Sequence, residues 1–185
     1  MCIRDSSNGD VAQNITVTNN SADILYLKTI NRGQPTPGKE PSAAARHLSL
    51  DISYKDMDGN AIDVNNLRQG TDFVQEIKIS NLGTRGYNIE EMVLNQIFPS
   101  GWEIQNSRLA NAPTSGKESS YEYRDIRDDR VYTFFDFKGK ETKTYITELT
   151  ATYAGKFYLP GTYTEAMYDN LIQAKTNGQW VEVKR

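Results

Sequence analysis

The chain has 185 residues, of which 37% are hydrophobic, and it carries a formal net charge of −3. This length suits one large domain, or one domain with a piece of a second. The slightly acidic balance argues against a nucleic-acid-binding protein, which needs a basic stripe, because the Lys and Arg residues are scattered among acidic ones. No apolar run reaches the length that spans a bilayer, so we expect no membrane insertion. Eleven tyrosines and six phenylalanines favour β structure, because aromatic side chains fit a pleated, half-buried surface.

The first residues give no signal of fold or function. Met1–Ser6 lacks the apolar core and small-residue cleavage site of a signal peptide, and it resembles the translated edge of a sequencing adapter. We therefore predict that residues 1–10 are a non-native or disordered leader and that Met1 is not the natural start. Cys2, the single cysteine, can form no internal disulfide and is excluded from functional reasoning.

Two short strand patterns come next. Residues 11–18 alternate between apolar and polar side chains, Asn19–Ser21 has turn chemistry, and residues 24–30 form a second apolar run. The pair predicts a β-hairpin. Two strands alone are marginal in water, so the hairpin must pack on further structure.

A proline-rich break separates this hairpin from the rest of the chain. Pro35, Pro37 and Pro41 fall close together, and a run of alanines follows. Proline removes backbone donors, so no strand is expected across residues 35–45, which we interpret as an interdomain linker. The alternative is a long loop inside one domain.

From residue 46 to the C-terminus, short strand patterns follow one another at regular spacing. One face of the first run is apolar, and it carries Leu48, Leu50, Ile52 and Tyr54. One face of the next carries Phe73, Gln75, Ile77 and Ile79. Further strands are predicted over residues 89–98, 102–104, 131–137, 142–153, 157–159, 163–167 and 179–183, with Tyr145, Leu149, Ala151 and Tyr153 on the apolar face of the longest, and a mobile loop over residues 110–120. Short strands with one wet face predict an all-β fold, an antiparallel two-sheet sandwich over residues 46–185.

Catalytic and metal-binding patterns are absent from the sequence. His47 is the sole histidine, it begins a strand pattern, and no nucleophile elbow accompanies it. Asp56, Asp58 and Asn60 hint at calcium, but Gly59 comes too early for an EF-hand loop, so a hairpin turn is the better interpretation. We therefore predict no enzyme, no cofactor and no metal.

One dense cluster of charges, Arg127, Asp128, Asp129 and Arg130, precedes an aromatic strand pattern. A tight turn with partly buried ion pairs is the preferred interpretation. The alternative is an interdomain clamp that uses bidentate arginine–carboxylate pairs.

Several weak motifs gain weight from their order along the chain. They are Leu50–Gly59, Leu67–Gly70, Phe98–Glu103, Asp125–Arg130, Ala154–Phe157 and Glu165–Tyr168. In this order they resemble the C-terminal macroglobulin-like domain of bacterial alpha-2-macroglobulins, a macroglobulin/fibronectin-like sandwich. Residues 11–34 resemble the end of the CUB-like domain that precedes it.

The resemblance implies a non-catalytic piece of a broad-spectrum protease inhibitor that is periplasmic, in the bacterial cell envelope, or secreted. In this family a helical domain carries a Cys-x-Glu-Gln thioester, which acylates the protease that cleaves the bait region. Cys2 is followed here by Ile-Arg-Asp, so the motif is absent. The expected partner is the thioester domain of the same parent chain and, through it, the target proteases.

The resemblance also implies a site. The loop that carries Glu165, Met167 and Tyr168 matches the element that shields the thioester from water. Methionine is an adaptable gap-filler and tyrosine adds apolar area with a polar tip, so both suit an irregular cover. We favour Met167 as the shield, with Tyr168 as its packing neighbour. The alternative is that Met167 and Tyr168 fill the core of the sandwich.

Two other functions stay open from sequence. A stand-alone surface module for adhesion or carbohydrate binding would need an exposed aromatic platform and no orphan hairpin. An enzyme is the weakest hypothesis, because no nucleophile, base and orienting group can be assembled.

Overall fold

The computed structural model describes residues 16–20, 22–28, 42–84, 88–105 and 118–185. The chain divides into two compact units, Met1–Gln34 and Pro35–Arg185. In the first unit, the described residues are exposed and form no strand, so the predicted hairpin does not form there. A pair of strands without a sheet beneath it buries too little apolar surface to persist. The leader over residues 1–10, the rest of the hairpin and most of the predicted loop over residues 110–120 lie outside the described residues.

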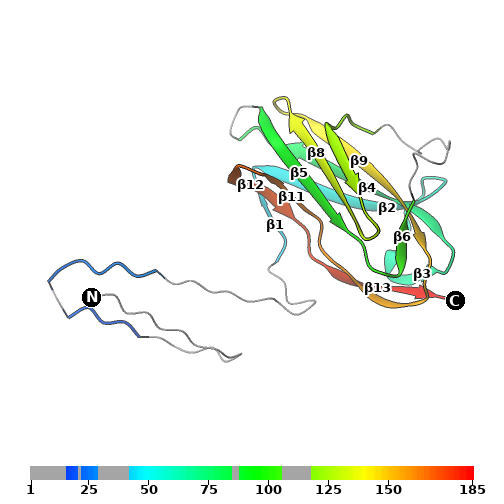
Figure 1. Cartoon of the computed structure of the whole chain (residues 1–185), viewed down its shortest axis with the longest axis horizontal. Helices are drawn as coiled ribbons and strands as arrows, with labels where there is room; N and C mark the ends of the chain where they lie inside the picture. Colours follow the sequence, from blue (N-terminus) through cyan, green and yellow to red (C-terminus); the bar gives the residue numbers. More distant parts are fainter. Residues whose placement is uncertain (1–15, 21, 29–41, 85–87, 106–117) are drawn as a thin grey trace. The chain divides into compact units, whose positions relative to one another are not determined.

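The second unit is built from short β-strands and one 3-10 turn (Figure 1). The strands are β1 (Ala44–Arg46), β2 (Leu48–Asp56), β3 (Leu67–Arg68), β4 (Asp72–Asn81), β5 (Ile89–Ile97), β6 (Trp102–Ile104), β7 (Tyr123–Ile126), β8 (Arg130–Phe137), β9 (Thr142–Ala151), β10 (Gly155–Leu159), β11 (Tyr163–Ala166), β12 (Asp169–Lys175) and β13 (Gln179–Lys184). The turn η1 (Val64–Asn66) precedes β3. No helix in the described part of the chain is long and apolar enough to cross a bilayer.

These strands form three sheets. A six-stranded sheet has the order β1-β12-β11-β5-β8-β7, and a four-stranded sheet has the order β2-β4-β9-β6. The order β10-β13-β3 makes a third sheet, in which β13 and β3 run parallel while all the other described pairs are antiparallel. The predicted all-β sandwich is confirmed.

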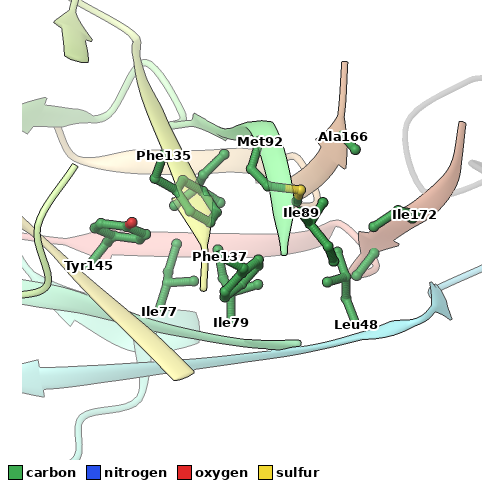
Figure 2. Packing of buried hydrophobic residues seen from close by; sticks show 12 residues of the cluster. Leu48, Ile77, Ile79, Ile89, Met92, Phe135, Phe137, Tyr145, Ala166 and Ile172 are labelled. Carbon is green, nitrogen blue, oxygen red and sulfur yellow. The ribbon is translucent and has the colours of Figure 1, made fainter. Parts of the chain in front are cut away.

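Two hydrophobic clusters fill the space between the sheets. The first is seen in Figure 2, where Phe135, Phe137 and Met92 from the six-stranded sheet face Ile77 and Ile79 from the four-stranded sheet. The second cluster contains Phe73, Trp102 and Leu149 of the four-stranded sheet, and the third sheet adds Leu67, Leu159, Val181 and Val183 to it. The period of two along β4, β8 and β9 produces these faces, since alternate side chains of a strand point to opposite sides.

A buried amide network also crosses the interior. The Nε2 of Gln96 in β5 donates to Gln75 Oε1 in β4 at 2.9 Å and to Thr147 Oγ1 in β9 at 2.8 Å. Gln75 Nε2 in turn donates to the hydroxyl of Tyr54 at 2.8 Å. Burial raises the pKa of Tyr54 to about 12, so this hydroxyl keeps its proton. The network joins one strand of the six-stranded sheet to three strands of the four-stranded sheet.

Several predicted boundaries are wrong. Ala44 and Ala45, assigned to the linker, belong to β1 and pair with Lys175 and Ala174 of β12, because the last proline is four residues earlier in the sequence than Ala45. Tyr153 is exposed rather than buried, because β9 ends at Ala151 and the next two amides donate to the carbonyl of Gly101. Strands β7 and β12 were not predicted, since their side chains alternate weakly.

His47 lies at a corner rather than at the start of a strand. Its φ of 64° turns the chain between β1 in one sheet and β2 in another, and its Nδ1 lies 2.6 Å from Thr84 Oγ1. Its role here is to turn the chain at the edge of the sandwich.

Candidate functional site

Met167 and Tyr168 form the two-residue turn that joins β11 to β12. Ala166 pairs with Asp169 across the base of this turn. Met167 is 43% exposed and Tyr168 is 87% exposed. The alternative that these two side chains fill the core is therefore wrong. They stand at the tip of a hairpin, with half-exposed Leu171 close by in sequence.

The hairpin beneath the tip is firmly anchored. Ala166 and Ile172 are buried among Ile89, Met92 and Leu48, as Figure 2 shows. The register between β11 and β12 shifts after Glu165, so that β12 carries extra residues near the turn. Leu171 N donates to Asp169 Oδ1 at 3.0 Å, and Gln173 Nε2 donates to Asn170 O at 2.9 Å, which orders these extra residues. The Met167 amide donates to the Glu91 carbonyl of β5 at 2.9 Å.

Glu165 lies in β11 and not in the turn. Its carboxylate accepts a short hydrogen bond from the hydroxyl of Tyr163, which also lies 3.3 Å from Gln173 Oε1. Burial and the bond to Glu165 raise the pKa of Tyr163 to about 12. The Tyr163 hydroxyl thus lies between Glu165 of β11 and Gln173 of β12, apart from the tip formed by Met167 and Tyr168.

The charge cluster over Arg127–Arg130 is the turn between β7 and β8. Arg127 N donates to Arg130 O at 2.9 Å, and Phe98 N donates to Asp129 O at 2.8 Å. The Nε and Nη2 atoms of Arg130 donate to the two carboxylate oxygens of Asp129, at 2.8 and 2.6 Å, and these hydrogen bonds lower the pKa of Asp129. Arg127 pairs with Asp125 at 2.9 Å, and Asp128 is exposed. Since both arginines pair with carboxylates beside or within their own turn, the tight turn is the better interpretation, although its ion pairs are more exposed than predicted.

Metal-binding geometry is not found in the described residues, which hold no group of three His, Cys, Asp or Glu side chains suited to an ion. Asp56 illustrates why. Its carboxylate accepts from the amides of Asp58 and Asn60, at 3.0 and 2.8 Å, and the Asn60 contacts lower its pKa. With Gly59 at a φ of 91°, this segment is the predicted turn at the end of β2.

An aromatic pair on the third sheet tests the idea of a carbohydrate platform. Tyr158 and Trp180 meet edge to face, with ring centroids 5.4 Å apart and an interplanar angle of 68°. The ammonium of Lys156 lies 5.5 Å from the Trp180 ring centre. These two rings therefore do not form the flat, open surface on which a sugar ring stacks.

Sequence reasoning missed Glu91, whose carbonyl contacts the turn, and Asp136, whose side chain contacts Glu91. Glu91 has a φ of 56°, and its amide donates to Asp136 Oδ1 at 2.9 Å. A signal was present, because buried Ile89 and Met92 are three residues apart whereas the later buried positions of β5 are two apart. Such a break in the period of two marks a β-bulge.

Comparison with known proteins gives a consistent result. Residues 48–170 match the family model described as the bacterial alpha-2-macroglobulin MG10 domain. An alpha-2-macroglobulin of Pasteurella multocida is 26% identical over 171 residues, which cover 89% of this chain and 8% of that protein.

Solved structures agree on the fold. The native alpha-2-macroglobulin of Escherichia coli, spanning domain MG7 to the C-terminus, superposes with a TM-score of 0.68 at 19% identity, covering 79% of this chain and 25% of that one. A Salmonella alpha-2-macroglobulin reacted with methylamine gives 0.68 at 20% identity, with coverage of 78% and 10%. The chain thus spans about a tenth of the length of the curated relatives it matches.

Proposed function

We propose, because the chain belongs to the bacterial alpha-2-macroglobulin MG10 family, that it is the MG10 part of a broad-spectrum protease inhibitor. In this role it is non-catalytic. It packs on the helical thioester domain of its parent chain in the inactive state, and it keeps water from the thioester. The parent protein acts in the bacterial periplasm, in the cell envelope or after secretion, and recovery of the parent only from a cytoplasmic fraction would contradict this location.

The observation that carries the proposal is the exposed tip of the β11–β12 hairpin. Met167 and Tyr168 offer apolar area to a partner, on a turn that several hydrogen bonds hold in place. A flexible thioether can fit an irregular surface, and the tyrosine ring adds area around it. A rigid stem with an adaptable apolar end is a suitable cover for a water-sensitive bond.

Such a cover acts through the difference between two states. Contacts at Met167 exist only while the two domains are docked, so they stabilise the inactive state and not the activated one. A contact of this kind changes the ratio of the two states about tenfold for each ~1.4 kcal/mol of its differential free energy. Proteolysis in the bait region would then need to overcome these contacts.

Met167→Ala in the full-length parent tests the proposal. We expect the rate of methylamine incorporation to rise roughly tenfold, the equivalent of ~1.4 kcal/mol of lost apolar cover. Tyr168→Ala is expected to give a smaller rise, because it is the neighbour of the shield. Both rates are measured with labelled methylamine before any protease is added.

Met57→Ala is the matched control. Met57 is also in a turn between strands, and it is 45% exposed against 43% for Met167. It lies in the turn after β2, far along the chain from the β11–β12 tip, so the rate should not change. A Met167→Ala protein that reacts with methylamine no faster than the Met57→Ala protein would disprove the shielding role.

A further inference from the structure

Glu91 has a backbone conformation that glutamate seldom adopts. Its φ is 56°, and only one other non-glycine residue in the described chain, His47, has a positive φ. The left-handed region is unfavourable for a side chain with a Cβ, and such strain persists only where surrounding contacts enforce it. Glu91 lies at a bulge, where the register of β5 against β8 shifts between Ile89 and Met92.

Asp136 is the contact that enforces this conformation. It lies in β8, next to β5 in the sheet, and its Oδ1 accepts the Glu91 amide at 2.9 Å. A bulge leaves backbone groups out of the strand ladder, and here a side chain supplies the missing acceptor. The carboxylate of Asp136 therefore fixes the peptide on the N-terminal side of Glu91.

The other side of Glu91 contacts the candidate site. Its carbonyl accepts the Met167 amide at 2.9 Å, and Met167 is the first residue of the exposed turn. A continuous path thus runs across three neighbouring strands, from Asp136 in β8 through Glu91 in β5 to Met167 after β11. Each step is a single hydrogen bond between named atoms.

Negatively charged side chains gather around this path and repel one another. Glu122 experiences the negative charges of Asp136, Glu91 and Glu90, and their repulsion, chiefly from Asp136, raises the pKa of Glu122. A neutral acceptor at position 136 would relieve the repulsion and keep the hydrogen bond. The acceptor function and the charge of Asp136 can therefore be separated by experiment.

We propose that Asp136 is a positioning residue for the Met167–Tyr168 turn, which it holds through the left-handed Glu91 peptide. It touches neither the turn nor the thioester. Its relevance to inhibition rests on the shielding role proposed above, but its effect on the turn can be measured without that role.

The first experiment follows amide hydrogen exchange of Met167 in the 185-residue chain by NMR. In Asp136→Ala, we expect exchange at Met167 to accelerate about tenfold, because the carbonyl that receives its hydrogen bond is no longer fixed. In Asp136→Asn, exchange should stay within about twofold of the parent rate, because an amide oxygen still accepts the Glu91 amide. Equal acceleration in both variants would overturn the proposal, since it would assign the effect to charge.

Asp63→Ala serves as the control for loss of an aspartate that accepts a backbone amide. Asp63 Oδ1 accepts the Asn65 amide at 3.0 Å, in the turn before β3. Exchange at Met167 should be unaffected in Asp63→Ala.

A second variant, Glu91→Gly, removes the backbone strain at position 91, so Asp136→Ala should accelerate exchange at Met167 less in that background. Acceleration of the same size in both backgrounds would also overturn the proposal.

The second experiment repeats Asp136→Ala in the full-length parent and measures methylamine incorporation. If Met167→Ala leaves incorporation unchanged while Asp136→Ala frees the Met167 amide, the shielding role fails and the positioning role stands. If Met167→Ala raises incorporation while Asp136→Ala leaves the Met167 amide protected, the positioning role fails alone. A rise in incorporation with Asp136→Ala, but not with Asp136→Asn, supports both roles.

Discussion

Glu76 shows how single residues contribute to the stability of this domain. It lies on the outer face of β4, where it accepts from Lys55 at 2.9 Å and contacts Lys78 at 3.2 Å. The hydrogen bond from Lys55 is the main cause of its lowered pKa. Its side chain is only 14% exposed, so solvent screens this pair less than the ion pairs of the Arg127–Arg130 turn.

A pH dependence follows from the direction of this shift. A carboxyl whose pKa is lowered by folding adds stability above its ordinary value of 4.5, and this stability is lost as the pH falls through the folded value. We expect Glu76→Gln to lower the free energy of unfolding by about 0.5–1 kcal/mol at pH 7. The difference from the parent should vanish near pH 3, which urea unfolding at both pH values can check. A difference that grows on acidification would contradict this assignment.

At the scale of elements, β6 leaves much of one edge of β9 unpaired, and a segment without regular strand structure covers part of that edge. β6 pairs with β9 only over residues 149–151, and further along Ser119 exchanges hydrogen bonds with Thr144. Glu118 Oε1 accepts a hydrogen bond from the Ile146 amide at 3.0 Å. Both carboxylate oxygens of Glu118 also accept hydrogen bonds from the guanidinium of Arg124 in β7. The Arg124 guanidinium also lies 4.3 Å from the ring centre of Tyr121. These contacts of Glu118 with Ile146 and Arg124 link the four-stranded sheet to the edge strand β7 of the six-stranded sheet.

Glu118→Ala should therefore be among the costly polar substitutions in the domain. It leaves the Ile146 amide without its acceptor and Arg124, 9% exposed, without its counter-charge. We expect a loss of about 2–3 kcal/mol in the free energy of unfolding. Asp125→Ala, which breaks the exposed pair with Arg127, should cost under about 1 kcal/mol by the same urea titration. Equal losses of unfolding free energy for the two variants would show that Glu118 does not link the two sheets.

The elements also show which parts of the site could be predicted from sequence. The strand over residues 163–167 is nearly right, because Thr164 and Ala166 alternate with polar neighbours. Only the family resemblance pointed to a loop here, because Met167 and Tyr168 have none of the glycine, asparagine or proline chemistry that marks a tight turn. A tertiary contact, the bond from the Met167 amide to Glu91, is made at this turn instead. The exposure of both side chains followed only from the structure.

At the scale of the whole molecule, the sandwich was predictable and its edges were not. The apolar faces of β2, β4, β8 and β9 follow the period of two, so the class of fold could be read from residues such as Ile77, Ile79 and Tyr145. β1 was missed because two small alanines and an arginine carry no alternation, and its place depends on pairing with β12. The hairpin over residues 11–30 was predicted from a local pattern, but its described residues are exposed.

A deletion tests where the stable domain begins. Removing residues 1–41 should leave the free energy of unfolding within about 0.5 kcal/mol of the whole chain, because the described residues of the first unit are exposed. Removing residues 1–46 should lower it further, because β1 is lost and the edge of β12 is uncovered. Urea unfolding of the three proteins gives both values. A clear loss of stability in the shorter deletion would place part of residues 1–41 within the cooperative domain.

The amide network of Gln75, Gln96 and Thr147 limits how the two large sheets can slide on one another. It is buried, and hydrocarbon side chains alone would tolerate several alignments with similar free energy. A slip of β5 by two residues would bring the Gln96 amide against aliphatic neighbours and abandon both of its acceptors. The observed alignment gives the Gln96 amide nitrogen both of its acceptors, so this network helps to set the position of β5, and with it the Glu91 carbonyl that receives the Met167 amide, relative to β4 and β9.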